Sequence, residues 1–79
     1  MSSLQTLSRG LAVLELVAEK ENGVTIAELS EALDVHRAIV YRLVSTLESH
    51  DLVTRGDSGR LCLGGGVVAL ASRVEPQLR

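Results

Sequence analysis

The residues best suited to chemistry in this sequence are arginines, and two of them lie within a stretch that has no acidic residue. Between Val35 and Leu47 there is no Asp or Glu, whereas His36, Arg37 and Arg42 lie within it. All but one of the Lys and Arg residues are arginines. The guanidinium group suits contacts with phosphate and with the edge of guanine. This pattern allows nucleic-acid binding, although it does not require it.

The net charge of −2 hides an uneven distribution of charge. Residues 1–34 hold two cations and six acids, a net −4, whereas residues 35–79 hold six arginines and four acids, a net +2. The distribution of charge along a chain says more about its partners than the total does. We therefore place any anionic partner on the second half of the chain.

Other chemistries find little support in the residue types and their spacing. We find no Ser/His/Asp set, no glycine-rich phosphate loop and no carboxylate pair with a supporting cleft, so an enzyme fragment is the weakest interpretation. His36, His50 and Cys62 lack metal-ligand spacing. The single Cys62 excludes an intramolecular disulfide and is interpreted as a packing residue rather than a redox sensor. We expect no catalysis, no metal and no cofactor.

Length and composition indicate one small domain. The chain has 79 residues, of which 46% are hydrophobic, with one Tyr and no Phe or Trp, so its core is expected to be aliphatic. No signal peptide and no run of roughly 18 to 20 apolar residues is visible, so we expect a cytoplasmic protein without a membrane partner. A domain of this size without disulfides often gains stability by forming oligomers.

Two helices are predicted in the first half. The first covers residues 3–21 and ends at Asn22–Gly23, before a bridging strand at residues 24–25. The second begins at Thr25 and Glu28, which have the spacing of a capping box, and runs to Leu33. Helical periodicity predicts that these residues face the core: Leu4, Leu7, Leu11, Leu14, Ala18, Ile26, Leu29 and Leu33.

A third helix is predicted over Arg37–Ser49, after a three-residue break at residues 34–36. Its buried stripe is expected to consist of Ile39, Val40, Leu43, Val44 and Leu47. The opposite face is neutral to basic, unlike the acidic outer faces of the first two helices. That opposite face carries Ala38, Tyr41, Arg42, Ser45 and Ser49.

A hairpin and a last helix complete the predicted elements. Residues 52–55 and 60–63 form the strands, and the turn-rich residues 56–59 connect them. Three glycines at 64–66 are interpreted as flexible, and a final helix is predicted over residues 67–75. Pro76 disfavours its continuation.

Three helices followed by a hairpin is the order of a winged helix-turn-helix, a mostly α fold with a small β-hairpin. In that geometry the third helix enters the major groove of DNA, and its first residues reach the base edges. The hairpin forms a wing beside the duplex, with Arg55 and Arg60 at its tip, on the backbone or in the minor groove.

Four segments of the sequence resemble the N-terminal DNA-binding domain of the isocitrate lyase regulator (IclR) family of bacterial transcription regulators. Residues 7–15 (LSRGLAVLE) are similar to its first helix, and residues 24–29 (VTIAEL) to the start of its second. Residues 40–47 (VYRLVSTL) are similar to its recognition helix, and residues 55–64 (RGDSGRLCLG) to its wing. Generic winged helices share the layout but not the setting of Arg42 or the Leu63–Gly64 ending. The four together, in order, are fairly specific.

The departures from the family pattern concern two turns and the recognition helix. Asp34 and Asp51 stand where the family usually has Gly, and both are expected to adopt the left-handed backbone that Asp tolerates. Ala38–Ile39 replaces the usual Ser–Thr pair, whose hydroxyls are expected to bind DNA. This loss shifts the contacts to neighbouring side chains and leaves Ala38 or Ile39 to touch a thymine methyl group.

The sequence and the resemblance together predict a set of DNA-binding residues. For several members a simpler role stays open: Thr25 and His36 as helix caps, Tyr41 as a packing residue, and the arginines as solvated charges. The set consists of Thr25, His36, Arg37, Ala38, Tyr41, Arg42, Ser45, Arg55 and Arg60.

The resemblance also implies an oligomer and a longer protein. We expect a homodimer that binds an inverted repeat of double-stranded DNA, paired through Ala12 and Leu16 of the first helix and Leu70 and Val74 of the last. Residues 1–65 would form the DNA-binding domain, and residues 66–79 a linker helix toward a C-terminal domain that binds a small-molecule effector and is absent here. The alternative is a winged helix that serves protein–protein contact or dimerisation without binding DNA.

Overall fold

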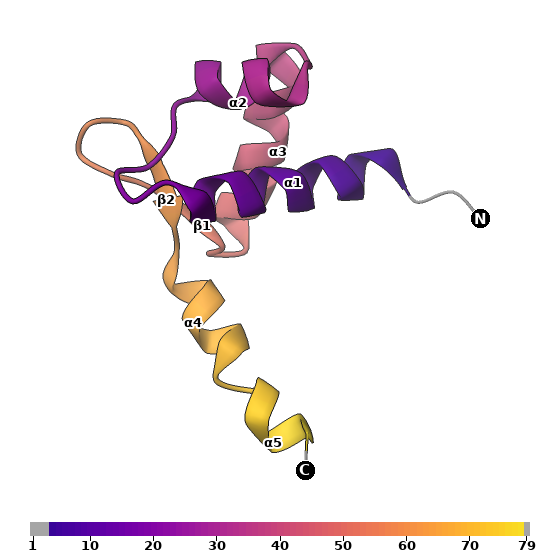
Figure 1. Cartoon of the computed structure of the whole chain (residues 1–79), viewed down its shortest axis with the longest axis vertical. Coiled ribbons are helices and arrows are strands. Elements are labelled where there is room, and N and C mark those ends of the chain that lie inside the picture. Colours follow the sequence, from indigo (N-terminus) through magenta and orange to yellow (C-terminus); the bar gives the residue numbers. More distant parts are fainter. Residues whose placement is uncertain (1–3, 79) are drawn as a thin grey trace.

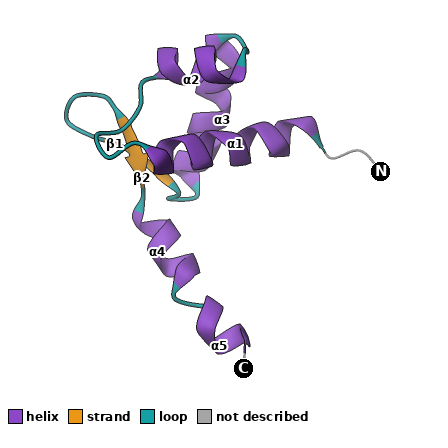
Figure 2. Cartoon of the chain, viewed as in Figure 1, coloured by secondary structure: helices purple, strands orange, loops and turns teal. Residues whose placement is uncertain are grey.

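Three helices, a hairpin and two short helices follow one another in the described part of the chain, residues 4–78 of a computed structural model (Figures 1 and 2). Ser3, the expected start of the first helix, lies outside the described residues. The elements are α1 (Gln5–Glu19), α2 (Ile26–Leu33), α3 (Arg37–Ser49), β1 (Val53–Arg55), β2 (Leu61–Leu63), α4 (Gly65–Ala71) and α5 (Val74–Leu78).

The core lies where the three helices meet the hairpin, and it is aliphatic as expected. Every element from α1 to β2 contributes to it, whereas α4 and α5 contribute no buried residue. Its buried hydrophobic residues are Val13, Val17, Val24, Ile26, Leu29, Val40, Leu43, Val44, Val53 and Leu61.

The buried side of α1 differs from the predicted stripe. Leu4, Leu7 and Leu11 are 75%, 59% and 52% exposed, whereas Val13 and Val17 are buried. Leu14 is partly buried against the core and Ala18 is exposed. The buried residues of α1 lie in its C-terminal half, whereas its N-terminal half lies beside α3 with its leucines exposed. The prediction was wrong because α1 has apolar residues on two faces, and long-range packing selects between them.

The hairpin is joined to the loop before α2 by a β-bridge. β1 and β2 pair antiparallel, with Val53 opposite Leu63. On the other edge of β2, Leu61 exchanges two backbone hydrogen bonds with Val24, at 3.0 and 2.7 Å. Gly23 has a φ of +84°, and a Cβ there would lie 2.8 Å from the Leu61 carbonyl oxygen. The predicted bridging strand is thus confirmed, and the approach of the loop to β2 needs glycine.

The turn between α2 and α3 has the predicted left-handed residue. Asp34 has a φ of 54° and ends α2. The backbone N–H of Val35 donates to the Ser30 carbonyl oxygen at 3.2 Å, and the Ser30 hydroxyl donates to the Val35 carbonyl oxygen at 2.6 Å. These two bonds close the turn and fix the direction in which α3 leaves it.

The end of α3 is tied to the start of α4. Asp51 is left-handed as predicted, with a φ of 62°, and its carbonyl oxygen accepts the backbone N–H of Gly66 at 2.8 Å. Gly64 precedes α4, and Gly65 and Gly66 form its first turn. The expectation of a flexible glycine segment was therefore wrong, since Gly65 and Gly66 are helical and Gly64 and Gly66 pack closely on the Asp51 backbone.

The expected last helix is divided into α4 and α5, which run away from the body (Figure 1). Pro76 lies in the first turn of α5 and does not end a helix. The first backbone N–H groups of a helix have no partner within it, so proline is tolerated there.

We expect Gly66→Ala to lower the free energy of unfolding by about 1–3 kcal/mol, because overpacking a close contact costs that much. A Cβ at Gly66 would lie 2.7 Å from the Asp51 carbonyl oxygen and 2.9 Å from that of His50. Urea unfolding followed by circular dichroism measures the change.

Gly65→Ala is the matched control, since a Cβ at Gly65 meets nothing within 4 Å. It should raise stability by about 0.4–1 kcal/mol through the lower entropy of the unfolded chain. Equal effects of the two substitutions would contradict the packing argument.

Candidate nucleic-acid interface

The outer face of α3 is exposed as the sequence predicts. The predicted contact residues of this helix are all exposed, because Val40, Leu43 and Val44 turn the opposite side into the core. Ile39 was expected in the buried stripe but is 37% exposed, and it lines surface hollows that it shares with Arg9 of α1. The exposed residues of this face are His36, Arg37, Ala38, Ile39, Tyr41, Arg42, Ser45 and Ser49.

His36 precedes α3 at the capping position but does not cap the helix with its side chain. Its backbone carbonyl oxygen accepts the N–H groups of Ile39 and Val40 at 3.0 and 3.2 Å. The imidazole is therefore exposed and unused at the helix start, and the capping role considered for it is not observed.

Arg9 is a candidate contact residue that the sequence analysis missed. It lines a surface hollow with Arg37 and Ile39, and a second hollow with Ile39, Arg42 and Thr46. Glu31 and Asp34 also line the first hollow, so acids border this surface. Arg9 is the only cation of the first 19 residues, and its place off the buried side of α1 was the available signal.

The two wing arginines are engaged within the chain. The Nε of Arg55 lies 3.5 Å from Oε2 of Glu48, and both side chains are substantially exposed. An exposed ion pair of this kind contributes little stability, so phosphate can compete for the arginine.

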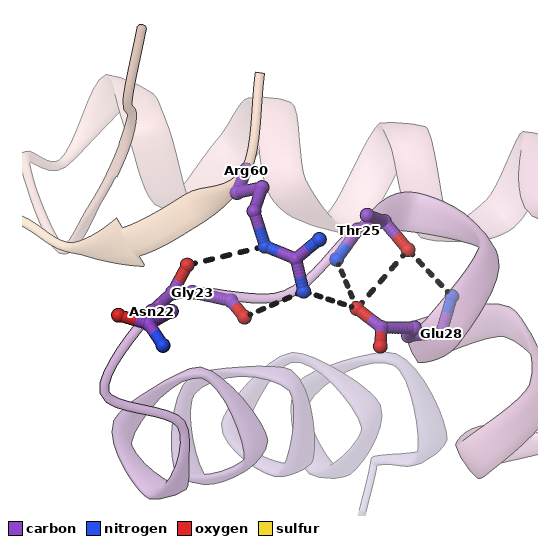
Figure 3. A network of polar contacts seen from close by, with 5 residues as sticks. All are labelled: Asn22, Gly23, Thr25, Glu28 and Arg60. Atoms are coloured by element: carbon purple, nitrogen blue, oxygen red, sulfur yellow. Dashed lines mark hydrogen bonds and ion pairs between the residues drawn. The ribbon is translucent and has the colours of Figure 1, made fainter. Parts of the chain in front are cut away.

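Arg60 is held more extensively than Arg55 (Figure 3). Its Nε donates to the Asn22 carbonyl oxygen at 3.1 Å, and its Nη2 donates to the Gly23 carbonyl oxygen at 3.2 Å and to Oε1 of Glu28 at 3.1 Å. The Arg60 side chain therefore connects the end of the wing loop to the loop before α2 and to the first turn of α2.

Thr25 and Glu28 form the predicted capping box. Thr25 Oγ1 accepts the Glu28 backbone N–H at 3.1 Å, and Glu28 Oε1 accepts the Thr25 backbone N–H at 2.9 Å. The backbone N–H of Thr25 lowers the pKa of the Glu28 carboxyl, against an opposing effect of desolvation. The Thr25 hydroxyl, Arg60 and Lys20 also lower this pKa. Thr25 is thus a helix cap, and its predicted contact with DNA stays a prediction.

The four residues predicted to form the dimer differ in their exposure. Leu16 was expected on the outer side of α1, but it is partly buried and packs against the core. Ala12 is half-buried, and Leu70 and Val74 are exposed. The exposed apolar surface of α1 lies instead in a groove between α1 and the end of α3, lined by Leu4, Leu7, Leu11, Leu43, Leu47 and Leu52.

Residues 4–78 contain neither a metal-binding cluster nor a membrane-spanning helix. No group of three or more His, Cys, Asp or Glu residues there is arranged to hold a metal ion. No helix within that range is long and apolar enough to cross a membrane.

Residues 6–57 match the model of the IclR helix-turn-helix domain, the DNA-binding domain of a group of transcription regulators. The chain belongs to the IclR family. The matched segment spans α1 to the tip of the wing, which confirms the family resemblance and the winged helix-turn-helix fold.

The curated relatives are repressors. The chain is 29% identical over 70 residues to the transcriptional repressor IclR of Escherichia coli, and equally to the acetate operon repressor of Salmonella typhimurium. Each match covers 87% of this chain but 26% of the relative. The chain thus spans about a quarter of the length of these relatives and corresponds to their helix-turn-helix part.

Solved structures of the family share the fold. An IclR transcriptional regulator from Alicyclobacillus acidocaldarius superposes with a TM-score of 0.82 at 26% identity, over 92% of this chain and 30% of that one. The repressor BlcR of Agobacterium tumefaciens gives 0.76 at 29% identity, over 87% of this chain and 28% of that one.

The lowered pKa of Glu28 predicts a pH dependence of stability. Its charge stabilises the folded chain above the ordinary pKa of 4.5, and that contribution is lost as the pH falls through the lower folded pKa. We expect Tm to fall in this acidic range, and Glu28→Gln to make the fall shallower. Glu31→Gln, in the same helix but outside the capping box, is the control. The same pH profile for wild type and Glu28→Gln would contradict this assignment.

Proposed function

We propose that the chain binds double-stranded DNA sequence-specifically, with α3 in the major groove. The observation that carries this proposal is the exposed outer face of α3, which is free of acids from His36 to Leu47 while the core holds its other side. DNA requires such a face, because phosphates repel carboxylates and attract guanidinium groups.

The N-terminal end of α3 supplies the proposed base contacts. Arg37 is placed to read a guanine, and Ala38 or Ile39 to touch a thymine methyl group. His36, Tyr41 and Ser45 hydrogen-bond phosphates or bases, and Arg42 binds a phosphate. Arg9 adds a phosphate contact from α1, since it borders both hollows beside these residues.

The wing contributes through Arg55. Its ion pair with Glu48 is exposed, so the guanidinium can exchange that carboxylate for a phosphate without loss of a buried interaction. Thr25 and Arg60 are not assigned direct contacts with DNA. The Thr25 hydroxyl is engaged in the capping box, and the Arg60 guanidinium is engaged in hydrogen bonds within the chain.

A second copy of the chain completes the proposed DNA-binding unit. The N-terminal half of α1 and helices α4 and α5 expose apolar side chains, among them Leu7, Leu11, Leu70 and Val74. Covering them in a two-fold dimer places two α3 helices on one side of an inverted repeat. Ala12 and Leu16 contribute less than the sequence indicates. Control by a small molecule is assigned to a separate C-terminal domain, and the location to the bacterial cytoplasm.

Selection from a random duplex pool, with sequencing of the bound DNA, should enrich an inverted repeat. On that duplex we expect Arg37→Ala to weaken binding about tenfold or more and to relax the preference at one position. Fluorescence anisotropy over a range of salt concentrations measures affinity. If Arg9, Arg42 and Arg55 each neutralise a phosphate, the slope of log K against log salt should be about −2.7 per protomer and about −5.4 for a dimer.

Arg73→Ala is the matched control, because Arg73 lies between α4 and α5, away from this face. It should leave the selected sequence unchanged and the affinity nearly so. Binding without enrichment would overturn sequence readout, and the absence of salt-sensitive binding would favour the protein–protein alternative.

Leu7→Glu and Leu11→Glu should convert a dimer to a monomer at micromolar concentration, because each puts a charge into the proposed apolar contact. Both residues are exposed, so the monomer should stay folded. Sedimentation velocity and circular dichroism measure the two properties. Ala32→Glu adds the same charge to an exposed site on α2 and should leave the dimer intact. A monomeric wild type would contradict the proposed pairing.

A further inference from the structure

Arg60 bridges parts of the chain that are far apart in sequence. It lies directly before β2, while its hydrogen-bond partners Asn22, Gly23 and Glu28 lie 32 to 38 residues earlier, before and within the first turn of α2. Figure 3 shows the guanidinium between the two backbone carbonyl groups on one side and the carboxylate on the other. The backbone bridge between Val24 and Leu61 lies beside it.

The carboxylate that pairs with Arg60 is also held in place by the capping box. Glu28 Oε1 also accepts the Thr25 backbone N–H at 2.9 Å and the Thr25 hydroxyl at 3.2 Å. An isolated exposed ion pair loses much of its energy to ordering two long side chains. Here the capping box has ordered Glu28, and two carbonyl oxygens orient the guanidinium, so less entropy is lost.

The tip of the wing depends on this attachment for its direction. Every residue from Thr54 to Gly59 is exposed, and the described wing is anchored by Val53, Leu61 and the Arg55–Glu48 pair on the side of α3. On the side of α2, the anchors are the Val24–Leu61 bridge and Arg60. Arg60 is therefore the side chain that, next to the backbone bridge, attaches the wing to the start of α2.

We propose that Arg60 is a positioning residue that locks the wing to the start of α2, so that the wing and α3 meet DNA as one rigid surface. This inference rests on the proposed DNA binding and deepens it. It assigns Arg60 to the orientation of Arg55 rather than to a phosphate contact of its own. Glu28, although acidic, then supports DNA binding indirectly.

Two substitutions separate positioning from contact. Lysine keeps the charge, and as a point charge it serves a phosphate contact, but it does not reproduce the planar donors that reach three acceptors. Arg60→Lys should therefore weaken DNA binding about as much as Arg60→Ala, and the two variants should change the salt slope alike, because each releases Arg55 from its phosphate. Glu28→Gln keeps the capping box, which accepts Gln at that position, and removes the ion pair.

The direction in which Glu28→Gln changes the affinity for DNA distinguishes a positioning role of the ion pair from simple repulsion between the acid and DNA. Removal of an acid near DNA normally raises affinity, and Glu31→Gln, the control in the same helix, should do so. Glu28→Gln should instead lower affinity, and combination with Arg60→Lys should add little further. The expected coupling is about fivefold in Kd. The probe is a duplex pool of roughly 30 base pairs, long enough for two half-sites about one helical turn apart.

A distance measurement without DNA tests the lock itself. Spin labels at Ser58→Cys in the wing loop and Ala32→Cys on α2, in a Cys62→Ala background, report the distance between wing and helix. Both labelled positions are exposed. The distribution should be narrow in the labelled parent and broad after Arg60→Lys, with circular dichroism showing that the variant is folded.

The outcomes are distinct. If Arg60→Lys keeps wild-type affinity while Arg60→Ala flattens the salt slope by about one, Arg60 is a phosphate contact and the proposal is overturned. An unchanged distance distribution in Arg60→Lys also overturns it. If the wild-type chain binds no DNA but the distribution broadens, the lock stands as a structural feature, while the proposed function and the role of Arg60 in it fail.

Discussion

The pairing of Leu61 with Val24 is the interaction on which the rest of the structure depends. Leu61 is fully buried, pairs with Arg55 in the hairpin and bonds to the loop before α2 on its other side. This one residue therefore joins the wing to the helical core. Gly23 makes it possible, because any side chain there would strike the Leu61 carbonyl group. In an aliphatic core without Phe or Trp, so close a backbone contact supplies order that large side chains supply elsewhere.

Features that depend on neighbouring residues could be predicted from the sequence. The capping box at Thr25 and the hairpin follow from local chemistry, the left-handed Asp34 follows from the family resemblance, and all three are present. The buried side of α1 could not be predicted, because leucines and valines occupy two faces of that helix and only residues of its C-terminal half are buried in the core. The position of Arg60 was equally hidden, since its three partners lie in a different part of the sequence.

The candidate site shows the same division. The outer face of α3 was predictable because a single helix with a clear buried side defines it. Arg9 was not, because only the crossing of α1 over α3 brings it beside Ile39 and Arg42. The loss of the family's Ser–Thr pair at Ala38–Ile39 leaves this part of the surface apolar. In the proposed complex the readout shifts from hydroxyl groups toward methyl contacts and arginines, and Ile39 is exposed as that role requires.

The role of each arginine follows from how firmly the nearest acid holds it. Among the described residues, Arg9, Arg37 and Arg42 form no ion pair, so no carboxylate has to be displaced in the DNA contacts proposed for them. Arg55 has an exposed partner in Glu48 and is available by exchange. Arg60 meets a carboxylate that a helix cap has already oriented, together with two carbonyl groups, and exchange there would dismantle three hydrogen bonds. The proposed division of roles thus reconciles an acidic chain with DNA binding, because some of its acids would hold the wing in place while its unpaired arginines face the duplex.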